Sequence, residues 1–226
     1  MLLSKIPEYI NCRKIYNNKK KDISFNFLST SSKYIKKNSV LVINKKNNFK
    51  KQYINEAINK GAIAIITNYY YKDIEIPQFL VKNIDECLKN LLWAIKKIPP
   101  NNIVGITGTN GKTSVLWKVS NIAYLSNRNV KSYGTLGYYK NSKKIENSIL
   151  TTPEYEILYQ KAYTNSKKNI SEFIFEVSSH SISKKRINKF PINIAALTNI
   201  SQDHLDFHKN ISNYRKTKFK LFSHHL

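Results

Sequence analysis

The sequence has few cysteines and no long apolar run. Its two cysteines, Cys12 and Cys87, are far apart and show no metal-ligand spacing, which predicts reduced thiols rather than a disulfide framework or a zinc site. No apolar stretch approaches the ~20 residues of a membrane span, and no charged-then-apolar secretory leader opens the chain. These absences predict a cytoplasmic protein that does not bind a membrane.

Arginine and acidic residues are also scarce. The chain has 38 Lys and Arg residues against 14 Asp and Glu, a formal net charge of +24, yet its only arginines are Arg13, Arg128, Arg186 and Arg215. Groove-reading proteins use arginine for bidentate contacts with bases, so this lysine-dominated charge favours a solvated surface coat. The composition therefore predicts no specific nucleic-acid partner, although it raises the general attraction for polyanions, including a phosphate-rich substrate.

The pattern of apolar residues predicts an α/β protein with two domains. A chain of 226 residues with 41% hydrophobic content can form one large domain or two modest ones. Pro99-Pro100 forces an extended break, which places the boundary between a small α/β domain at 1–97 and a second domain at 98–226. Apolar runs and helix-period patterns predict the first domain's strands at 40–43 and 62–67 and its helices at 51–60 and 84–97.

The second domain repeats a strand, loop and helix pattern, with buried strands expected at 103–106, 172–177 and 194–197. Its first loop lies in V-G-I-T-G-T-N-G-K-T-S, which begins at Val104 and leads into an expected helix at 115–124. The pattern differs from the general P-loop because position 106, where that motif has its first glycine, is Ile.

This loop has the chemistry of a phosphate cradle. Glycines allow the backbone to approach a polyphosphate, and the N–H groups at the start of the following helix point at it. Lys112 would neutralise phosphate oxygens, and the Thr113 hydroxyl would hold a magnesium ion. The alternative is a glycine-rich turn that binds no nucleotide; the lysine and threonine directly after the last glycine favour nucleoside triphosphate binding.

The strand expected at 172–177 runs into E-V-S-S-H. Ligands of parallel α/β sheets gather where strands end, and a buried carboxylate must be paired or bound to a metal. Glu176 near the Thr113 hydroxyl would be an oxygen ligand for Mg²⁺. Two alternatives are that Glu176 caps a neighbouring helix and that Ser178 and His180 form a nucleophile pair, for which no third orienting group is identifiable.

The strand expected at 194–197 runs into T-N-I-S-Q-D-H-L-D-F-H. Here His204 is a candidate metal ligand or general base, and Asp203 capping the following turn is the alternative. Next comes Y-R-K-T-K-F-K-L-F, which predicts a basic helix with Tyr214 and Lys218 on one face. A lysine on an apolar helix face is costly unless it reaches solvent or is modified. On these residues alone, the favoured interpretation is a solvated run of lysines.

Together these segments resemble the Mur ligases, and within that family the MurE type, the UDP-N-acetylmuramoyl-tripeptide synthetases of peptidoglycan assembly. The resemblance covers about residues 98–223 and is carried, in family order and spacing, by G-I-T-G-T-N-G-K-T-S, Y-G-T-L-G, L-T-T-P-E, E-V-S-S-H-S-I…R, T-N-I-S-Q-D-H-L-D-F-H and Y-R-K-T-K-F-K-L-F. It implies a small amino-terminal substrate domain (1–97) followed by a P-loop-type ATP-binding domain with a mostly parallel sheet (98–226).

The resemblance also implies four sets of site residues, which overlap in part. The ATP-binding loop would comprise Gly108, Thr109, Asn110, Gly111, Lys112 and Thr113. The UDP-muramoyl-peptide would be held by Ser32, Thr151, Thr152, Ser178 and Arg186. The magnesium ligands would be Thr113, Glu176, His204 and, once carbamylated, Lys218. Lys112, His204 and Lys218 would be the catalytic residues.

The implied reaction uses ATP and Mg²⁺ and has two chemical steps. A carboxylate of UDP-MurNAc-L-Ala-D-Glu attacks the γ-phosphate to give an acyl phosphate and ADP, and an amino group of a diamino acid then displaces phosphate. Catalysis would rest on positioning and on neutralising phosphoryl charge. We expect a monomer. Alternatives are another ligase of the superfamily, such as the folylpolyglutamate type, or a non-catalytic nucleotide-binding or nucleic-acid-binding remnant.

The sequence departs from the family pattern in four respects. The amino-terminal substrate motif is weakly matched around Ser32, and Lys184 and Gln202 replace a family glutamine and arginine. The family's third, amino-acid-binding domain and its D-N-P-R-type motif are not among the 226 residues. We therefore expect a fragment, a truncated gene product or half of a split enzyme, which would be inactive without a separate carboxy-terminal domain.

Overall fold

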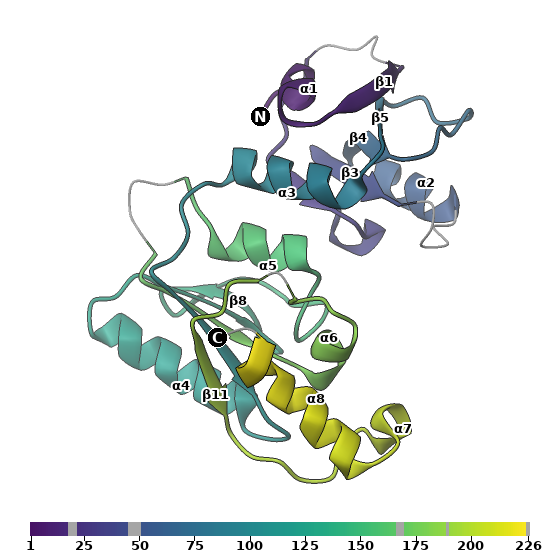
Figure 1. Ribbon diagram of the computed structural model, residues 1–226. Coiled ribbons are helices and arrows are strands. Elements are labelled where there is room, and N and C mark those ends of the chain that lie inside the picture. The colour runs from purple at the N-terminus through teal and green to yellow at the C-terminus, as the bar shows by residue number, and fades with distance from the viewer. Residues whose placement is uncertain (18–21, 45–50, 166–169, 189, 225–226) are drawn as a thin grey trace. The chain divides into compact units, whose positions relative to one another are not determined.

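The computed structural model describes residues 1–17, 22–44, 51–165, 170–188 and 190–224 (Figure 1). It contains two compact units, Met1–Lys97 and Ile98–Leu226. Each unit has its own sheet, and the mixed α/β class expected from the sequence is confirmed. No helix in the described ranges combines the length and apolar character of a membrane span.

The first unit has a five-stranded sheet in the order β1-β5-β4-β3-β2. Its strands are β1 (Cys12–Tyr16), β2 (Phe27–Ser29), β3 (Ser39–Ile43), β4 (Ala62–Thr67) and β5 (Gln78–Val81). Strands β2 to β5 are parallel, and β1 is antiparallel to β5. The helices are η1 (Leu3–Lys5), α1 (Ile6–Tyr9), η2 (Ser32–Tyr34), α2 (Lys51–Asn59) and α3 (Ile84–Ile95). The strands and helices predicted for this unit are confirmed, except that α3 ends two residues early.

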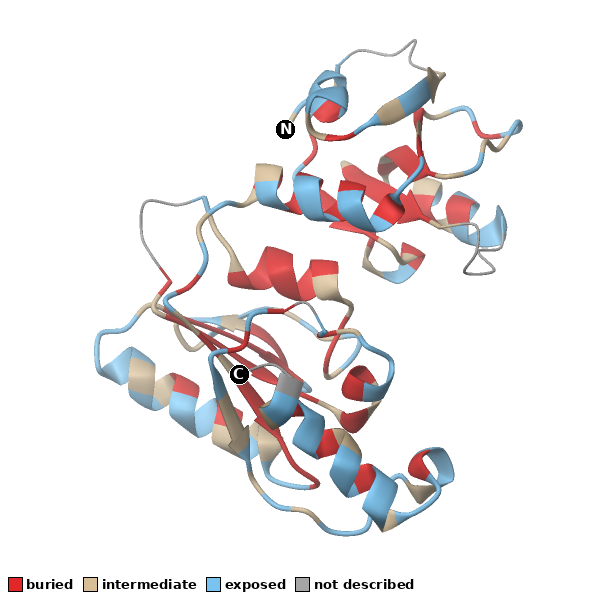
Figure 2. Ribbon diagram, viewed as in Figure 1, coloured by how far each residue is buried: buried red, intermediate tan, exposed pale blue. Residues whose placement is uncertain are grey.

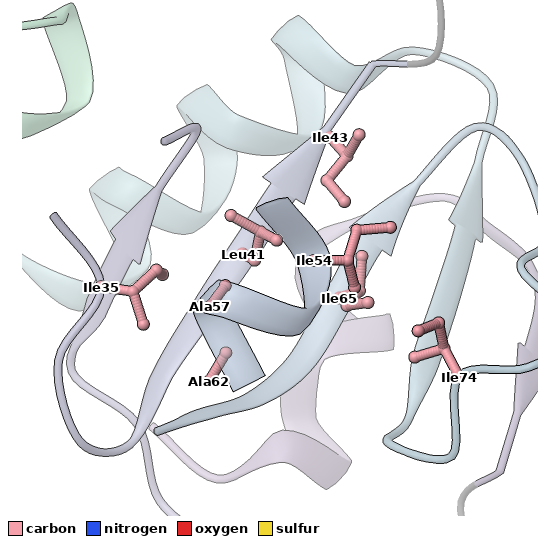
Figure 3. Packing of buried hydrophobic residues seen from close by; sticks show 8 residues of the cluster. All are labelled: Ile35, Leu41, Ile43, Ile54, Ala57, Ala62, Ile65 and Ile74. Atoms are coloured by element: carbon pink, nitrogen blue, oxygen red, sulfur yellow. The ribbon is translucent and has the colours of Figure 1, made fainter. Parts of the chain in front are cut away.

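The core of the first unit lies between α2 and the sheet. Figure 3 shows Ile54 and Ala57 of α2 facing Leu41 and Ile65 of the central strands. Because β3 and β4 are covered on both faces, every residue of β3 is buried, and these strands are continuous apolar runs in the sequence. That continuity explains why these strands were predicted correctly.

The second unit has a six-stranded sheet in the order β11-β6-β10-β7-β8-β9. Its strands are β6 (Asn102–Thr107), β7 (Val130–Gly134), β8 (Gly137–Lys140), β9 (Lys143–Glu146), β10 (Glu172–Glu176) and β11 (Ile194–Leu197). Strands β11, β6, β10 and β7 are parallel, and β8 and β9 add antiparallel edges. The helices are α4 (Lys112–Leu125), α5 (Tyr155–Ala162), α6 (Ser179–Ser183), α7 (Leu205–His208) and α8 (Ile211–His224).

The alternating side chains of β10 divide this unit into two cores. On one face, Ile174 clusters with Ile106, Leu116 of α4 and Val130. On the other face, the rings of Phe173 and Phe175 stack at 5.6 Å and both contact Phe190 edge-on. The inner strands β7 and β10 are fully buried, whereas β9 and β11 at the two edges of the sheet have no buried residue. Figure 2 shows that α4 and α8 alternate buried and exposed residues, as amphipathic helices do.

Candidate active site

The loops that follow β6, β7, β10 and β11 lie at one edge of the second sheet, because these four strands are parallel. This edge is where parallel α/β sheets bind ligands. Among the candidate residues, only Ser32 belongs to the first unit.

Residue Gly108 shapes the loop after β6. Its φ is +149°, and a Cβ atom there would lie 1.9 Å from Thr198 Oγ1, so no larger residue fits. The Asn199 amide holds the loop from the end of β11: Asn110 N–H donates to Asn199 Oδ1 (3.1 Å), and Asn199 Nδ2 donates to Asn110 O (3.0 Å). Helix α4 begins directly afterwards at Lys112, so its first N–H groups, which have no acceptor within the helix, open at this edge.

Two lysine ammonium groups meet at the Gly108 carbonyl. Lys112 Nζ donates to Gly108 O and Thr109 O, each at 2.8 Å, and Lys218 Nζ also donates to Gly108 O at 2.8 Å. Burial lowers the pKa of Lys112, opposed by the charges of Glu176 and Asp203. Two cations on one carbonyl oxygen make this loop a strongly anion-attracting place.

Lys218 is buried, with 2% of its surface exposed, so it is not part of a solvated lysine run. Burial, helped by the nearby Lys112 charge and opposed by Asp203, lowers its pKa to about 8. A substantial fraction of the amine is therefore neutral near pH 8, as attack on CO₂ requires. The same side chain lies over the Tyr214 ring, with Nζ 4.7 Å from the ring centroid.

The Glu176 carboxylate is fully buried at the end of β10, next to the glycine loop. Its Oε1 accepts the Thr113 hydroxyl (3.0 Å) and the Thr135 N–H (2.9 Å), and its Oε2 accepts the Thr135 hydroxyl (3.2 Å). Gly134 makes room for it, because a Cβ there would lie 2.2 Å from Glu176 Oε1. The structure thus brings Thr113 and Glu176 together, and the carboxylate contacts Thr113 and Thr135 rather than capping a helix.

The Thr113 hydroxyl and the Glu176 carboxylate fit a magnesium ion as oxygen ligands. Mg²⁺ prefers hard oxygen ligands, and a buried carboxylate beside a hydroxyl supplies them. The groups that donate hydrogen bonds to Glu176 are uncharged, and its negative charge interacts with the nearby Lys112 ammonium. Within the described ranges, no three His, Cys, Asp or Glu side chains form a ready-made metal cluster, so the fit rests on Thr113 and Glu176.

Four of the residues expected to hold substrate form one hydrogen-bonded group. The Thr152 hydroxyl lies 2.8 Å from Glu176 O and accepts the Ser178 N–H at 2.9 Å. Arg186 donates to Thr152 O at 3.2 Å, and the hydroxyl of Thr151 lies 3.1 Å from that of Thr135. An ion pair of 3.0 Å between Arg186 Nε and Glu154 Oε1 fixes the guanidinium.

Ser178 is hydrogen-bonded to Thr152 through its N–H group and to the start of α6 through its hydroxyl, which accepts the Ser181 N–H (3.2 Å). His180 instead packs against the ring of His204, 4.9 Å between centroids. The nucleophile-pair alternative for Ser178 and His180 therefore lacks a contact in the structure.

His204 is half-exposed and adopts a left-handed backbone with a φ of +51°. The neighbouring Asp203 accepts the His204 N–H at 2.9 Å, whereas α7 begins without a side-chain cap. The other ring in this segment, His208, is buried and lies 2.9 Å from Ser179 Oγ.

Ser32 is buried in the first unit at the start of η2. Its hydroxyl donates to Glu56 Oε2 at 2.8 Å, and Glu56 also pairs with Lys60 at 2.5 Å. Ser32 is therefore held by α2 within its own unit.

Sequence reasoning gave no role to Thr135, Asn199 and Tyr214. Asn199 lies two residues after β11, where the rule that polar residues at strand ends are candidates applies; Thr135 directly follows β7, a strand that the sequence did not predict, so the rule could not find it. The hydroxyl of Tyr214 contacts Thr109, which is 105 residues away in the sequence, and no local pattern signals such a contact.

Comparison with known proteins shows similarity over most of the chain. Residues 106–226 match the family model described as the Mur ligase middle domain. The chain is 33% identical over 210 residues to the UDP-N-acetylmuramoyl-L-alanyl-D-glutamate–2,6-diaminopimelate ligase of Rickettsia typhi, covering 91% of this chain and 43% of that protein. It is 36% identical over 175 residues to the protein of the same name from Alkaliphilus oremlandii, covering 75% of this chain and 35% of that protein.

Solved structures show the same fold. A UDP-N-acetylmuramoyl-L-alanyl-D-glutamate–2,6-diaminopimelate ligase superposes with a TM-score of 0.59 at 23% identity, covering 88% of this chain and 41% of that one. The MurF ligase from Thermotoga maritima in complex with ADP gives a TM-score of 0.56 at 21% identity, with coverages of 88% and 43%. The chain spans less than half the length of the curated relatives it matches.

Proposed function

The chain belongs to the Mur ligase family, and from this premise we propose that it carries the nucleotide-binding and UDP-substrate-binding parts of an ATP-dependent amide ligase. The observation that carries the proposal is the pairing of Thr113 with the buried Glu176 beside Lys112, at the edge where α4 begins. The relatives from R. typhi and A. oremlandii are named for 2,6-diaminopimelate, so we propose this diamino acid as the one that the whole protein adds.

The glycine loop and Lys112 would bind the ATP phosphates. The Lys112 ammonium donates hydrogen bonds to two loop carbonyls, Gly108 O and Thr109 O. When ATP binds, phosphate oxygens would replace these carbonyls as its acceptors. Thr113 and Glu176, with His204, would hold Mg²⁺. The ion would neutralise charge that develops on the transferring phosphoryl group.

Lys218 would complete the site by carbamylation. The ammonium first loses a proton to solvent. The neutral amine then forms a bond to the carbon of CO₂ as one C=O π bond opens, and the nitrogen releases a second proton, so that overall a cation becomes an anion with two oxygen ligands. An unmodified ammonium would repel Mg²⁺, and its nearness to Lys112 adds a second repulsion that the carbamate would turn into attraction.

The muramoyl-peptide would be held in the second unit by Thr151, Thr152, Ser178 and Arg186. In the first unit, Ser32 is the residue that we propose for binding uridine diphosphate. The substrate carboxylate would attack the γ-phosphorus of ATP, ADP would leave, and the amine of the diamino acid would displace phosphate from the acyl phosphate. The residues of this chain orient the carboxylate and balance charge, so none of them needs to act as a nucleophile.

Calorimetry with MgATP and the 226-residue chain tests the proposal. We expect saturable binding that Lys112→Ala weakens at least about tenfold, because the ammonium's charge-assisted bonds to phosphate are lost. Lys118→Ala, an exposed lysine on the same helix, is the matched control and should leave binding unchanged. Absence of MgATP binding by the wild-type chain, or equal effects of the two variants, would refute the proposal.

A further inference from the structure

Tyr214 lies between the glycine loop and Lys218. It is 1% exposed on α8, one turn before Lys218, and its hydroxyl lies 3.1 Å from Thr109 Oγ1. The face of its ring lies 4.7 Å from Lys218 Nζ, and the His208 ring packs edge-on at 5.3 Å. One side chain therefore contacts both the loop and the buried lysine.

The hydrogen bonds at Thr109 fix the direction of its bond with Tyr214. The Thr109 hydroxyl lies 3.2 Å from the Ser201 carbonyl, which can only accept, and it receives the Ser201 N–H at 3.0 Å. A hydroxyl has one hydrogen and two lone pairs, so after these two bonds Thr109 has one acceptor position left. Tyr214 must fill it as the donor.

We propose that Tyr214 is a positioning residue that sets the glycine loop against Lys218, an inference that rests on the function proposed above. Its O–H holds Thr109, the residue next to the Gly108 carbonyl that both lysines share. Its ring holds the Lys218 amine through a cation–π contact while the amine is charged and through packing when it is neutral. The two contacts come from separate parts of the side chain, so they can be removed separately.

Two variants and one control separate these contacts. Tyr214→Phe keeps the ring and removes the donor to Thr109, and Tyr214→Leu removes both. Tyr138→Phe is a matched control, because Tyr138 is also buried, its hydroxyl donates to Lys161 O (3.2 Å), and Lys161 Nζ lies 4.7 Å from its ring centroid.

The first readout is hydrogen exchange of the loop peptide around residues 107–114 in the nucleotide-free chain. We expect Tyr214→Phe to speed exchange there about threefold to tenfold, and to raise the Kd for MgATP by a similar factor, as the loss of one buried hydrogen bond implies. Tyr138→Phe should lower the melting temperature about as much as Tyr214→Phe does, but should leave the loop exchange rate and the Kd for MgATP unchanged. Unchanged loop exchange in Tyr214→Phe overturns the proposal.

The second readout is the carbamate carbon signal of Lys218 in NMR spectra recorded with ¹³C-bicarbonate. Tyr214→Phe should retain this signal, because it keeps the part of Tyr214 that contacts the Lys218 amine, the ring. Tyr214→Leu should lose at least half of the signal, because it removes the ring. Equal signals in both variants, or none in the wild-type chain, overturn the Lys218 half of the proposal. A wild-type chain that fails to bind MgATP refutes the proposed function instead, and the exchange experiment still decides whether Tyr214 holds the loop.

Discussion

Replacing Glu176 with Gln tests the proposed metal site most directly. The side chain keeps its size in a fully buried position, and its remaining carbonyl oxygen can still accept from Thr113 and from the Thr135 N–H. Its new amide group faces the Thr135 hydroxyl, which can turn to accept. Because the substitution also removes a buried charge, we expect the free energy of unfolding of the metal-free chain to fall by no more than about 1 kcal/mol.

Nucleotide binding should respond very differently. Removing an outer-shell partner of a bound metal typically costs about 10-fold to 100-fold in metal affinity. Loss of a carboxylate that contacts the ion itself should cost at least the upper figure, so the Kd for MgATP should rise about 100-fold or more, or about 2.7 kcal/mol. Binding of ATP in the presence of EDTA should not weaken, because the variant also removes a negative charge close to the phosphates.

The assay is calorimetric titration of ATP with and without magnesium, alongside chemical denaturation. Glu172→Gln is the control: it makes the same substitution at the other end of β10, where Glu172 pairs with Arg128 at 2.6 Å, and should leave both affinities unchanged. If Glu176→Gln binds MgATP as tightly as the wild type, the carboxylate serves only to hold Thr113 and Thr135. That result would show that the Glu176 carboxylate does not bind the metal ion.

Three further outcomes are expected. Gly134→Ala should lower the free energy of unfolding by about 1–3 kcal/mol, measured by denaturation, because its Cβ would displace Glu176; an unchanged midpoint would contradict the close approach. Carbamate formation at Lys218, measured by ¹³C NMR, should rise as the pH increases through about 8. The pKa of Lys218 is lowered to about 8 and only the neutral amine reacts, so about a tenth of the amine is reactive at pH 7. A signal that falls over pH 7–9 would contradict this. Arg186→Lys should weaken UDP-muramoyl-dipeptide binding about tenfold without changing MgATP affinity, because a lysine cannot reproduce the two-sided contact with Glu154 and Thr152 O; equal losses for both ligands would argue against a substrate role.

Sequence reasoning worked where a strand is apolar on both faces. The run at Ala62–Thr67 is continuous and apolar, and β4 has those bounds. It failed at β7, whose sequence V-K-S-Y-G is polar although every residue is buried. Lys131 is buried there because two backbone carbonyls, Ala162 O and Tyr163 O, accept its ammonium hydrogens. Hydropathy cannot register such compensation, because the partners are distant in the chain.

In the candidate site too, some contacts could be predicted from the sequence and others could not. Thr113 and Glu176 could be brought together from the sequence, because both lie at the carboxyl ends of expected parallel strands. The contacts that shape the site around them could not: the shared Gly108 carbonyl and the Tyr214 hydroxyl depend on how α8 crosses the loop. The pattern showed Lys218 on an apolar helix face, but only the packing of the whole unit determines which carbonyl it reaches.

The two-sided packing of β10 also controls the position of the Glu176 carboxylate. Residues Glu172, Ile174 and Glu176 share one parity along the strand, and Phe173 and Phe175 have the other. Inserting or deleting one residue within β10 would exchange the two sets and turn the carboxylate into the aromatic layer. The packing of the two hydrophobic cores therefore determines which face of the sheet receives the Glu176 side chain, and β10 can change in length before Glu176 only in steps of two residues.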